Sequence, residues 1–156
     1  MAPVRDFPLF PLGIVALPTE LIPLHIFEER YKTMMARCLE EGSEFGIVWL
    51  SDDGLRPTGC ACEIAEVLER LPDGRMNLIA RGTRVFRIEA RQEELAYPAG
   101  TVEFGLDAKQ GLLDLRSESA RMKLVTRLFR AALKRLDFID RAQARARSNG
   151  KVHFTA

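Results

Sequence analysis

The spacing of apolar residues changes along the chain, and each change predicts a different kind of element. Residues 7–12 consist of phenylalanine, leucine and proline. Because proline has no backbone N–H, this run predicts an edge strand or an extended arm rather than a central strand with a continuous hydrogen-bond ladder. From Phe27 the apolar residues recur at intervals of three and four, which predicts an amphipathic helix over residues 28–41 with Phe27 on its apolar side. Gly42 can close this helix.

The middle of the chain carries the signals of β-strands. Dense or alternating apolar segments occur at residues 45–50, 60–71, 75–80, 84–89 and 100–104. Pro72, Asp73 and Gly74 separate two of them and supply the dihedral angles of a tight reversal, which predicts a hairpin. The α+β chain is therefore expected to form a mostly antiparallel sheet that is closed or nearly closed.

A second helix is predicted after Gly111, beginning near Asp114 or Ser117. One face of it collects the apolar residues Leu124, Val125, Leu128, Phe129, Ala132, Leu133 and Leu136. This face needs a partner surface. Large apolar residues become scarce from Asp140, so the expected parts are a sheet region (1–111), a helical segment (112–139) and a basic polar tail (140–156) that frays.

Charge is distributed unevenly along the 156 residues. Residues 1–120 contain 13 Lys and Arg against 20 Asp and Glu, a net charge of −7, whereas residues 121–156 contain 10 against 2, a net charge of +8. Hydrophobic residues make up 47% of the chain, which suits one ordinary globular domain. Without an apolar run of about eighteen residues, we expect a cytoplasmic protein with three reduced cysteines.

Three parts of the chain resemble the amino-terminal substrate-recognition domain of Lon-type proteases. The matching runs are Phe7–Leu12, Leu17-Pro18, Pro23–Tyr31, Glu63–Val67, Leu71–Leu78 and Arg81–Ile88. They cover roughly residues 5–106, with a weaker helical continuation to about 138. The tail after Ile139 resembles nothing in that family. As a resemblance, this implies a PUA-like β-barrel followed by a shortened helical subdomain, in a stand-alone bacterial member.

No motif for catalysis or cofactor binding stands out in the sequence. There is no glycine-rich phosphate loop and no counterpart of the Ser-Lys pair of Lon-type peptidases, so we expect a protein that is not an enzyme and uses no cofactor or metal. Cys60 and Cys62 could join Cys38 or His25 in a zinc site, but two cysteines so closely spaced are more typical of buried small side chains. His25 beside Glu28 is more typical of a satisfied core or rim residue than of an acid–base pair.

The resemblance implies a non-catalytic module that binds unfolded or apolar polypeptide segments, as a quality-control factor or as an adaptor working with a protease or chaperone. The prolines of residues 11–23 stiffen this region, so we predict a peptide-binding groove lined by Phe10, Leu17, Leu21, Leu24 and Ile26. Some of these must belong to the core, and Leu21 is the one expected to face solvent.

The alternative is an RNA-binding protein that uses the basic carboxy-terminal helix. Against RNA binding, the preceding 120 residues are acidic and few aromatic residues accompany the arginines. The two that do, Phe129 and Phe138, are expected on the apolar face of the helix. Neither polypeptide binding nor RNA binding requires a membrane, and we expect no membrane partner.

Overall fold

The computed structural model describes residues 2–105 and 107–154. The elements follow in the order β1 (Val4–Leu12), β2 (Leu21–Ile26), α1 (Glu29–Glu41), β3 (Phe45–Ser51), β4 (Gly54–Arg70), β5 (Met76–Gln92), β6 (Ala99–Phe104) and α2 (Asp107–Phe154). The chain divides into two units, residues 1–117 and residues 118–156. Each unit is described by itself below.

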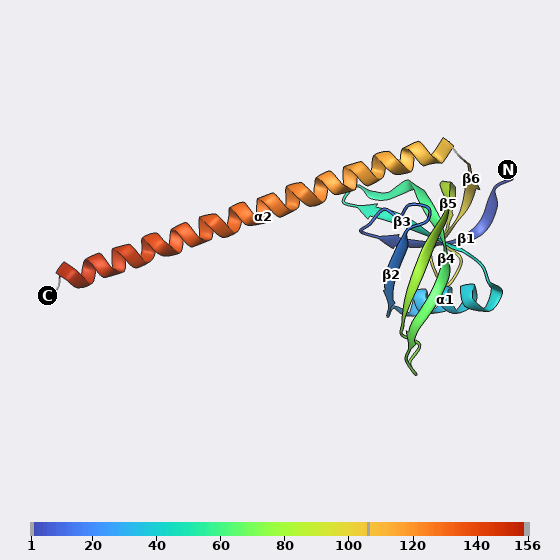
Figure 1. The fold of residues 1–156 in the computed structure, drawn as a ribbon, viewed down its shortest axis with the longest axis horizontal. Coiled ribbons are helices and arrows are strands. Elements are labelled where there is room, and N and C mark those ends of the chain that lie inside the picture. The colour runs from blue at the N-terminus through green and yellow to red at the C-terminus, as the bar shows by residue number, and fades with distance from the viewer. Residues whose placement is uncertain (1, 106, 155–156) are drawn as a thin grey trace. The chain divides into compact units, whose positions relative to one another are not determined.

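The strands form one sheet that closes on itself. The order is β2-β5-β4-β3-β1-β6, and β5 also pairs with β6, so β1, β3, β4, β5 and β6 make a ring. The β2 strand pairs with β5 outside this ring, next to the turn that joins β4 to β5 (Figure 1). All pairings are antiparallel except that of β1 with β3. A mostly antiparallel, closed sheet is what the alternating segments predicted.

The position of β1 differs from the predicted edge strand, because β1 lies between β3 and β6. Its first half pairs with β6, with Pro8 opposite Ala99, and its second half pairs with β3, with Pro11 opposite Val48. The two ladders therefore cover different halves of the strand. Each proline lies where only one side of β1 is paired, which is how a strand with two prolines can occupy the interior of a sheet.

Helix α1 confirms the predicted amphipathic helix. It buries Tyr31, Met34, Met35 and Cys38, and it ends at Gly42, whose φ of 63° is the left-handed conformation that glycine adopts most easily. Phe27 is the exception, because it precedes the helix and its side chain is 59% exposed. The prediction that Phe27 belongs to the buried side of the helix is wrong.

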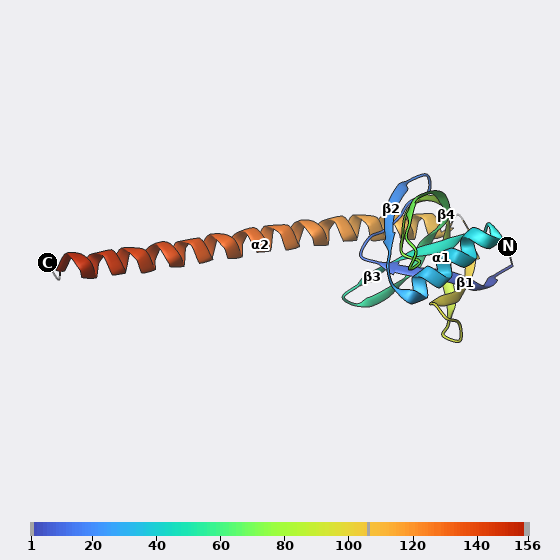
Figure 2. The same cartoon turned by 90° about the horizontal axis from the view of Figure 1, so that it is seen from below.

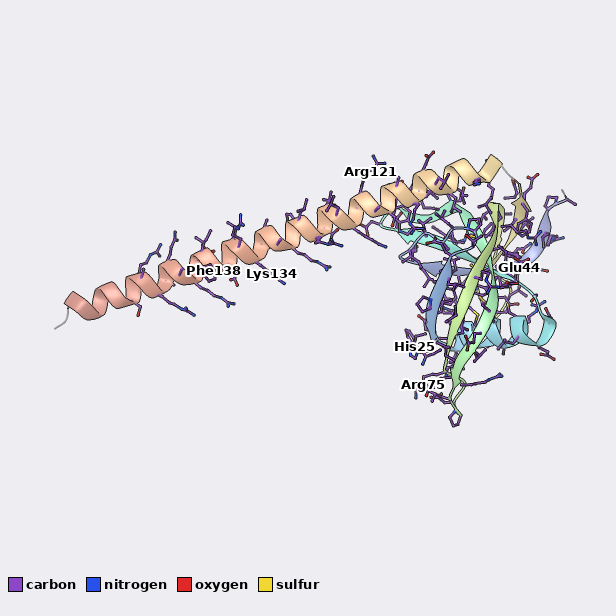
Figure 3. The ribbon with its side chains drawn as sticks, in the orientation of Figure 1. His25, Glu44, Arg75, Arg121, Lys134 and Phe138 are labelled. Atoms are coloured by element: carbon purple, nitrogen blue, oxygen red, sulfur yellow. The ribbon has the colours of Figure 1, made fainter. Side chains whose placement is uncertain are left out.

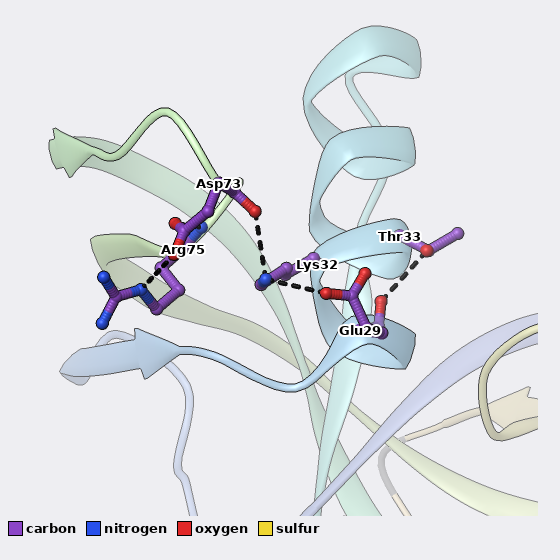
Figure 4. A network of polar contacts seen from close by, with 5 residues as sticks. All are labelled: Glu29, Lys32, Thr33, Asp73 and Arg75. Atoms are coloured by element: carbon purple, nitrogen blue, oxygen red, sulfur yellow. Dashed lines mark hydrogen bonds and ion pairs between the residues drawn. The ribbon is translucent and has the colours of Figure 1, made fainter.

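A polar network ties the turn of the β4–β5 hairpin to the first turn of α1 (Figure 4). Figure 2 shows the ribbon from below, the side of Figure 1 on which this hairpin end lies. The Lys32 ammonium donates to the backbone oxygen of Asp73 at 3.0 Å and pairs with the Glu29 carboxylate at 2.9 Å. Within the turn, the Arg75 Nε–H donates to Asp73 Oδ2 at 2.7 Å. Hydrogen bonds from the Arg75 backbone and side chain hold the pKa of Asp73 below its usual range. The hairpin end is thereby positioned against the helix.

The first unit has two groups of buried apolar side chains. One lies between Phe7, Phe86 and Phe104, whose rings meet edge to face at centroid distances of 5.5 to 6.1 Å. The larger group joins α1 to the sheet and includes Phe45, Met76 and Leu78, all fully buried. Burying each such side chain stabilises the fold by about 1.5–3 kcal/mol.

Helix α2 begins at Asp107, earlier than the predicted start near Asp114 or Ser117. Its first turns belong to the first unit, where Leu112 is 1% exposed in the larger core group. The Arg116 guanidinium binds both carboxylate oxygens of Glu20, at 2.6 and 3.2 Å, and also donates to the backbone oxygen of Val15. The loop between β1 and β2 is thus fastened to the start of α2.

The second unit contains the rest of α2, which is helical to Phe154 and so includes most of the tail that was predicted to fray. The apolar residues predicted to need a partner surface are exposed on it, with Phe129 at 64% and Leu128 at 61%. Neither α1 nor α2, within the part of the chain that the structure describes, contains a stretch apolar enough to cross a lipid bilayer.

Candidate functional site

The five residues proposed for peptide binding are divided between core and surface. Phe10, Leu24 and Ile26 are buried, Leu17 is half-buried against the larger core group, and Leu21 is 60% exposed. Phe10 and Ile26 come together as part of the lining of one groove, and Leu24 lines a neighbouring hollow. Leu21 faces solvent, as expected from its place between the prolines.

The groove shared by Phe10 and Ile26 has a volume of about 560 Å³ and is called the Phe27 groove below. It lies where the end of β1, the junction of β2 with α1, and the β3–β4 turn come together. Its lining consists of Phe10, Pro11, Leu12, His25, Ile26, Phe27, Glu28, Arg30, Tyr31, Leu50, Gly54, Leu55, Arg91 and Pro98.

Apolar side chains dominate both the floor and the walls of the Phe27 groove. Phe10 and Tyr31 form the floor, with ring centroids 4.4 Å apart. Phe27 and Leu50 stand in the walls and are 59% and 51% exposed. Exposed apolar groups that line a concave surface gain free energy when a bound apolar group displaces water from them. This arrangement suits a bulky apolar side chain.

Charged residues line the rim of the groove. Arg30 pairs with Glu28 at 3.1 Å, and its guanidinium lies 4.7 Å from the centroid of the Tyr31 ring. Burial raises the pKa of the Tyr31 phenol, and the Arg30 charge acts in the opposite direction. Arg91 also lines the groove, and the ion pairs of the described residues do not include it. The rim can therefore offer a cation to a bound carboxylate.

The outward face of β2 leads from the Leu21 end of the strand, which pairs with Arg81, to the groove beyond Ile26. Alternate residues Leu21, Pro23 and His25 are exposed, and Phe27 continues the same spacing. The rings of His25 and Phe27 are stacked with centroids 5.7 Å apart. These four residues, called the outer β2 row below, span about 20 Å at the rise of an extended strand.

A chain of polar side chains holds His25 in place beside a shallow hollow. His25 Nδ1 lies 2.6 Å from the Asn77 side-chain oxygen, which accepts, so the Nδ1–H donates. The Asn77 amide in turn donates to Glu69 at 3.1 Å. His25 lies towards the hairpin end of the sheet (Figure 3). Its contacts fit a positioning role at the rim, as the sequence suggested, rather than acid–base chemistry with Glu28.

The cysteines lie away from this surface. Cys38, Cys60 and Cys62 are buried in the larger core group, as their predicted role of small apolar residues requires. Burial raises the pKa of Cys38, and a hydrogen bond with Cys60 together with burial raises that of Cys62. Both shifts favour the neutral thiol. Within residues 2–105 and 107–154, no group of three His, Cys, Asp or Glu is placed to hold a metal ion.

Among the groove residues that sequence reasoning missed, Phe27, Leu50 and Arg91 matter most for binding, because they supply the exposed apolar walls and a cation at the rim. Phe27 fits both the helical and the strand spacing. It is four residues from Tyr31, as on one face of a helix, and two residues from His25, as on one face of a strand. Only the second spacing describes its side chain. The ends of β3 and β5 supply Leu50 and Arg91 from distant parts of the chain, and no local pattern connects them with Phe27.

Comparison with known proteins gives consistent matches. A family model of the ATP-dependent protease La (LON) substrate-binding domain matches residues 6–153. The crystal structure of a Lon N-terminal domain protein from Xanthomonas campestris is 32% identical, with a TM-score of 0.57 over 65% of this chain and 60% of that chain. The N-terminal domain of a Mycobacterium avium complex Lon protease is 20% identical, with a TM-score of 0.47 over 87% of this chain and 75% of that chain.

The family match extends beyond the region in which the sequence resemblance was recognised. It continues to residue 153, so the statement that the tail after Ile139 resembles nothing in the family is wrong. The scattered arginines and alanines of this tail form no short motif by which the likeness could be recognised. The chain spans 60% of the length of the Xanthomonas campestris structure.

Proposed function

This chain belongs to the family of LON substrate-binding domains, and we propose that it is a non-catalytic module that binds apolar segments of unfolded polypeptides in the Phe27 groove. The observation that carries the proposal is that two large exposed apolar side chains, Phe27 and Leu50, line one groove with an aromatic floor. Such a module would deliver clients to a protease or chaperone, as an adaptor in protein quality control.

The outer β2 row extends the proposed surface beyond the groove. An extended client lying along β2 would contact Leu21 and Pro23 before its bulky side chain enters the groove beside Phe27. Among the described strands β2 pairs only with β5, which leaves its other edge unpaired, and Pro23 lacks a backbone donor in the middle of this strand. Side-chain contacts, rather than addition of a client strand, would therefore supply most of the affinity.

Replacing Phe27 with aspartate should weaken client binding about tenfold, equivalent to about 1.4 kcal/mol, because the substitution places a charge in an apolar wall. Leu21→Asp should weaken binding by a similar factor if clients follow the outer β2 row. Both side chains are mostly exposed, so thermal stability should change little. The measurement is fluorescence anisotropy with a labelled, carboxymethylated client protein that cannot fold.

Val4→Asp is the matched control, because Val4 is 41% exposed at the other end of β1 and lies outside the groove lining. This variant should bind clients as the wild type does. Undiminished binding by the folded Phe27→Asp variant would exclude the groove. If only Leu21→Asp lost binding, the contact would lie on the outer face of β2 alone.

One observation favours the RNA alternative. Phe138 is 71% exposed and follows Lys134 by one helical turn, with Arg141 three residues later, so it lies on the basic side of α2 (Figure 3). The expectation that Phe138 belongs to the apolar face is wrong. A labelled RNA titrated in parallel separates the two functions, because RNA binding should be lost in Phe138→Ala and retained in Phe27→Asp.

A further inference from the structure

Helix α2 exposes a regular apolar seam between residues 122 and 139. Its members alternate three and four residues apart, as in a two-stranded coiled coil. They are Met122, Val125, Phe129, Ala132, Leu136 and Ile139. The five large side chains are 42% to 64% exposed. A helix is stabilised mainly by packing of its apolar face, so we expect another apolar surface to cover this seam.

We propose that the seam pairs with the same seam of a second copy of this chain, in antiparallel orientation. The intervals along the seam are 3, 4, 3, 4 and 3 residues, and they read the same in both directions. An antiparallel partner therefore meets it in full register, and the pairing is a closed two-fold contact that leaves no seam free for a third copy.

Side-chain volume favours the antiparallel orientation. In that register Phe129 packs against the second copy's Ala132, and Val125 against its Leu136. Large residues thus face small ones through the middle of the seam. A parallel pair would set Phe129 against Phe129 and Ala132 against Ala132. The two phenylalanines would be overpacked, and the two alanines would leave a cavity.

Charge also favours the antiparallel orientation. Residues 141–151 carry Arg141, Arg145, Arg147 and Lys151 without an acidic residue. A parallel pair would hold these two basic ends together. The antiparallel pair separates them and places each beside the start of the other α2, where Asp114 and Glu118 add negative charge and the acidic residues of the first unit precede the helix.

The outer surface of α2 is consistent with this pairing. Arg127, Lys134 and Arg141 lie at seven-residue spacing on the side opposite the seam and stay in water. Leu124, which is 51% exposed, also falls outside the seam. These positions provide matched controls for each substitution in the seam.

Disulfide cross-linking tests both the pairing and its direction. A mixture of the Met122→Cys and Ile139→Cys variants of the full chain should form a disulfide-linked dimer on mild oxidation, with one copy of each. Neither variant alone should form a disulfide. In the antiparallel pair the two copies of the same cysteine are separated by 17 helical residues, about 25 Å. The native cysteines are buried and give little background.

A mixture of Arg127→Cys and Lys134→Cys is the control, because these residues lie at matching levels on the outer face and should not link. Self-linking of Met122→Cys alone would establish a parallel pair and overturn the proposed direction. Sedimentation velocity supplies the second readout: Val125→Glu should dissociate the dimer, while the neighbouring Leu124→Glu should leave it intact. A wild-type protein that is monomeric at tens of micromolar, with an unlinked seam, would overturn the proposal.

Discussion

At the residue scale, Gly82 shows how closely the loop before β2 approaches the ring. A Cβ atom at this position would lie 2.2 Å from the backbone oxygen of Leu17, far inside van der Waals contact. The same loop is fastened by two backbone hydrogen bonds, from Thr19 to Gly82 at 2.8 Å and from Gly82 to Glu20 at 2.9 Å. The neighbour of Gly82 is backbone, so it cannot turn aside as a flexible side chain would.

We therefore expect Gly82→Ala to lower the free energy of unfolding by about 1–3 kcal/mol, the usual cost of overpacking. Urea denaturation followed by tryptophan fluorescence measures it. Gly13→Ala is the control, because a Cβ atom at Gly13 meets nothing within 4 Å. Equal stability of the two variants would mean that the loop can move away from β5 at little cost.

Single residues also mark the limit of sequence-based inference. The buried positions of α1 follow directly from their spacing, because a helix repeats its faces at a fixed interval. The exposure of Phe27 does not follow from its spacing, because a residue between a strand and a helix is not fixed by the repeat of either element. Pro8 and Pro11 predicted the broken ladder of β1 correctly, but their spacing could not reveal that two different strands pair with its two halves.

At the scale of elements, the Glu20–Arg116 ion pair links the β1–β2 loop to the start of α2. The hydrogen bond from Arg116 holds the pKa of Glu20 below its usual value, with partial burial acting in the opposite direction. A carboxyl whose pKa is lower in the folded state stabilises the fold above its unfolded pKa. This stabilisation is lost as pH falls through the lowered, folded pKa.

Glu20→Gln should accordingly lower the melting temperature at neutral pH, and the difference from wild type should shrink as the pH is lowered below about 4.5. Scanning calorimetry between pH 3 and pH 7 measures this. Glu63→Gln removes an exposed pair with Arg81 and should have a smaller effect at neutral pH. A difference for Glu20→Gln that stays constant over the whole range would show that the charge of Glu20 contributes nothing.

Among the elements, those held by local contacts were the most predictable. The hairpin at Pro72–Gly74 and helix α1 were located from turn residues and periodicity. The start of α2 was not, because Leu112 is buried against a core assembled from distant strands, and the cap residues Asp114 and Ser117 gave a stronger local signal. Leu50 and Arg91, which reach the groove from the ends of β3 and β5, could not be predicted for the same reason.

At the scale of the whole molecule, residues 1–117 contain the core, and the tail adds no core residue among its described side chains. Removing residues 140–156 should therefore change the melting temperature by less than about 5 °C, equivalent to on the order of 1–2 kcal/mol. Truncation after Gly111 is the control, because it removes Leu112 and Arg116 and should destabilise the fold strongly. A large loss from the shorter truncation would show that the tail packs on folded structure.

The pairing of β1 with β6 has a consequence for the order of events during synthesis. The first strand of the chain completes its ladder only with the last strand, about 90 residues later, which a ribosome adds in roughly 5–20 s. The hairpins among β3, β4 and β5 connect near neighbours and can form within that interval. Until β6 emerges, Phe7 and Leu9 have only part of their final surroundings. The nascent chain therefore spends seconds as an open sheet with an exposed apolar end, and during that time it resembles the unfolded clients that it is proposed to bind.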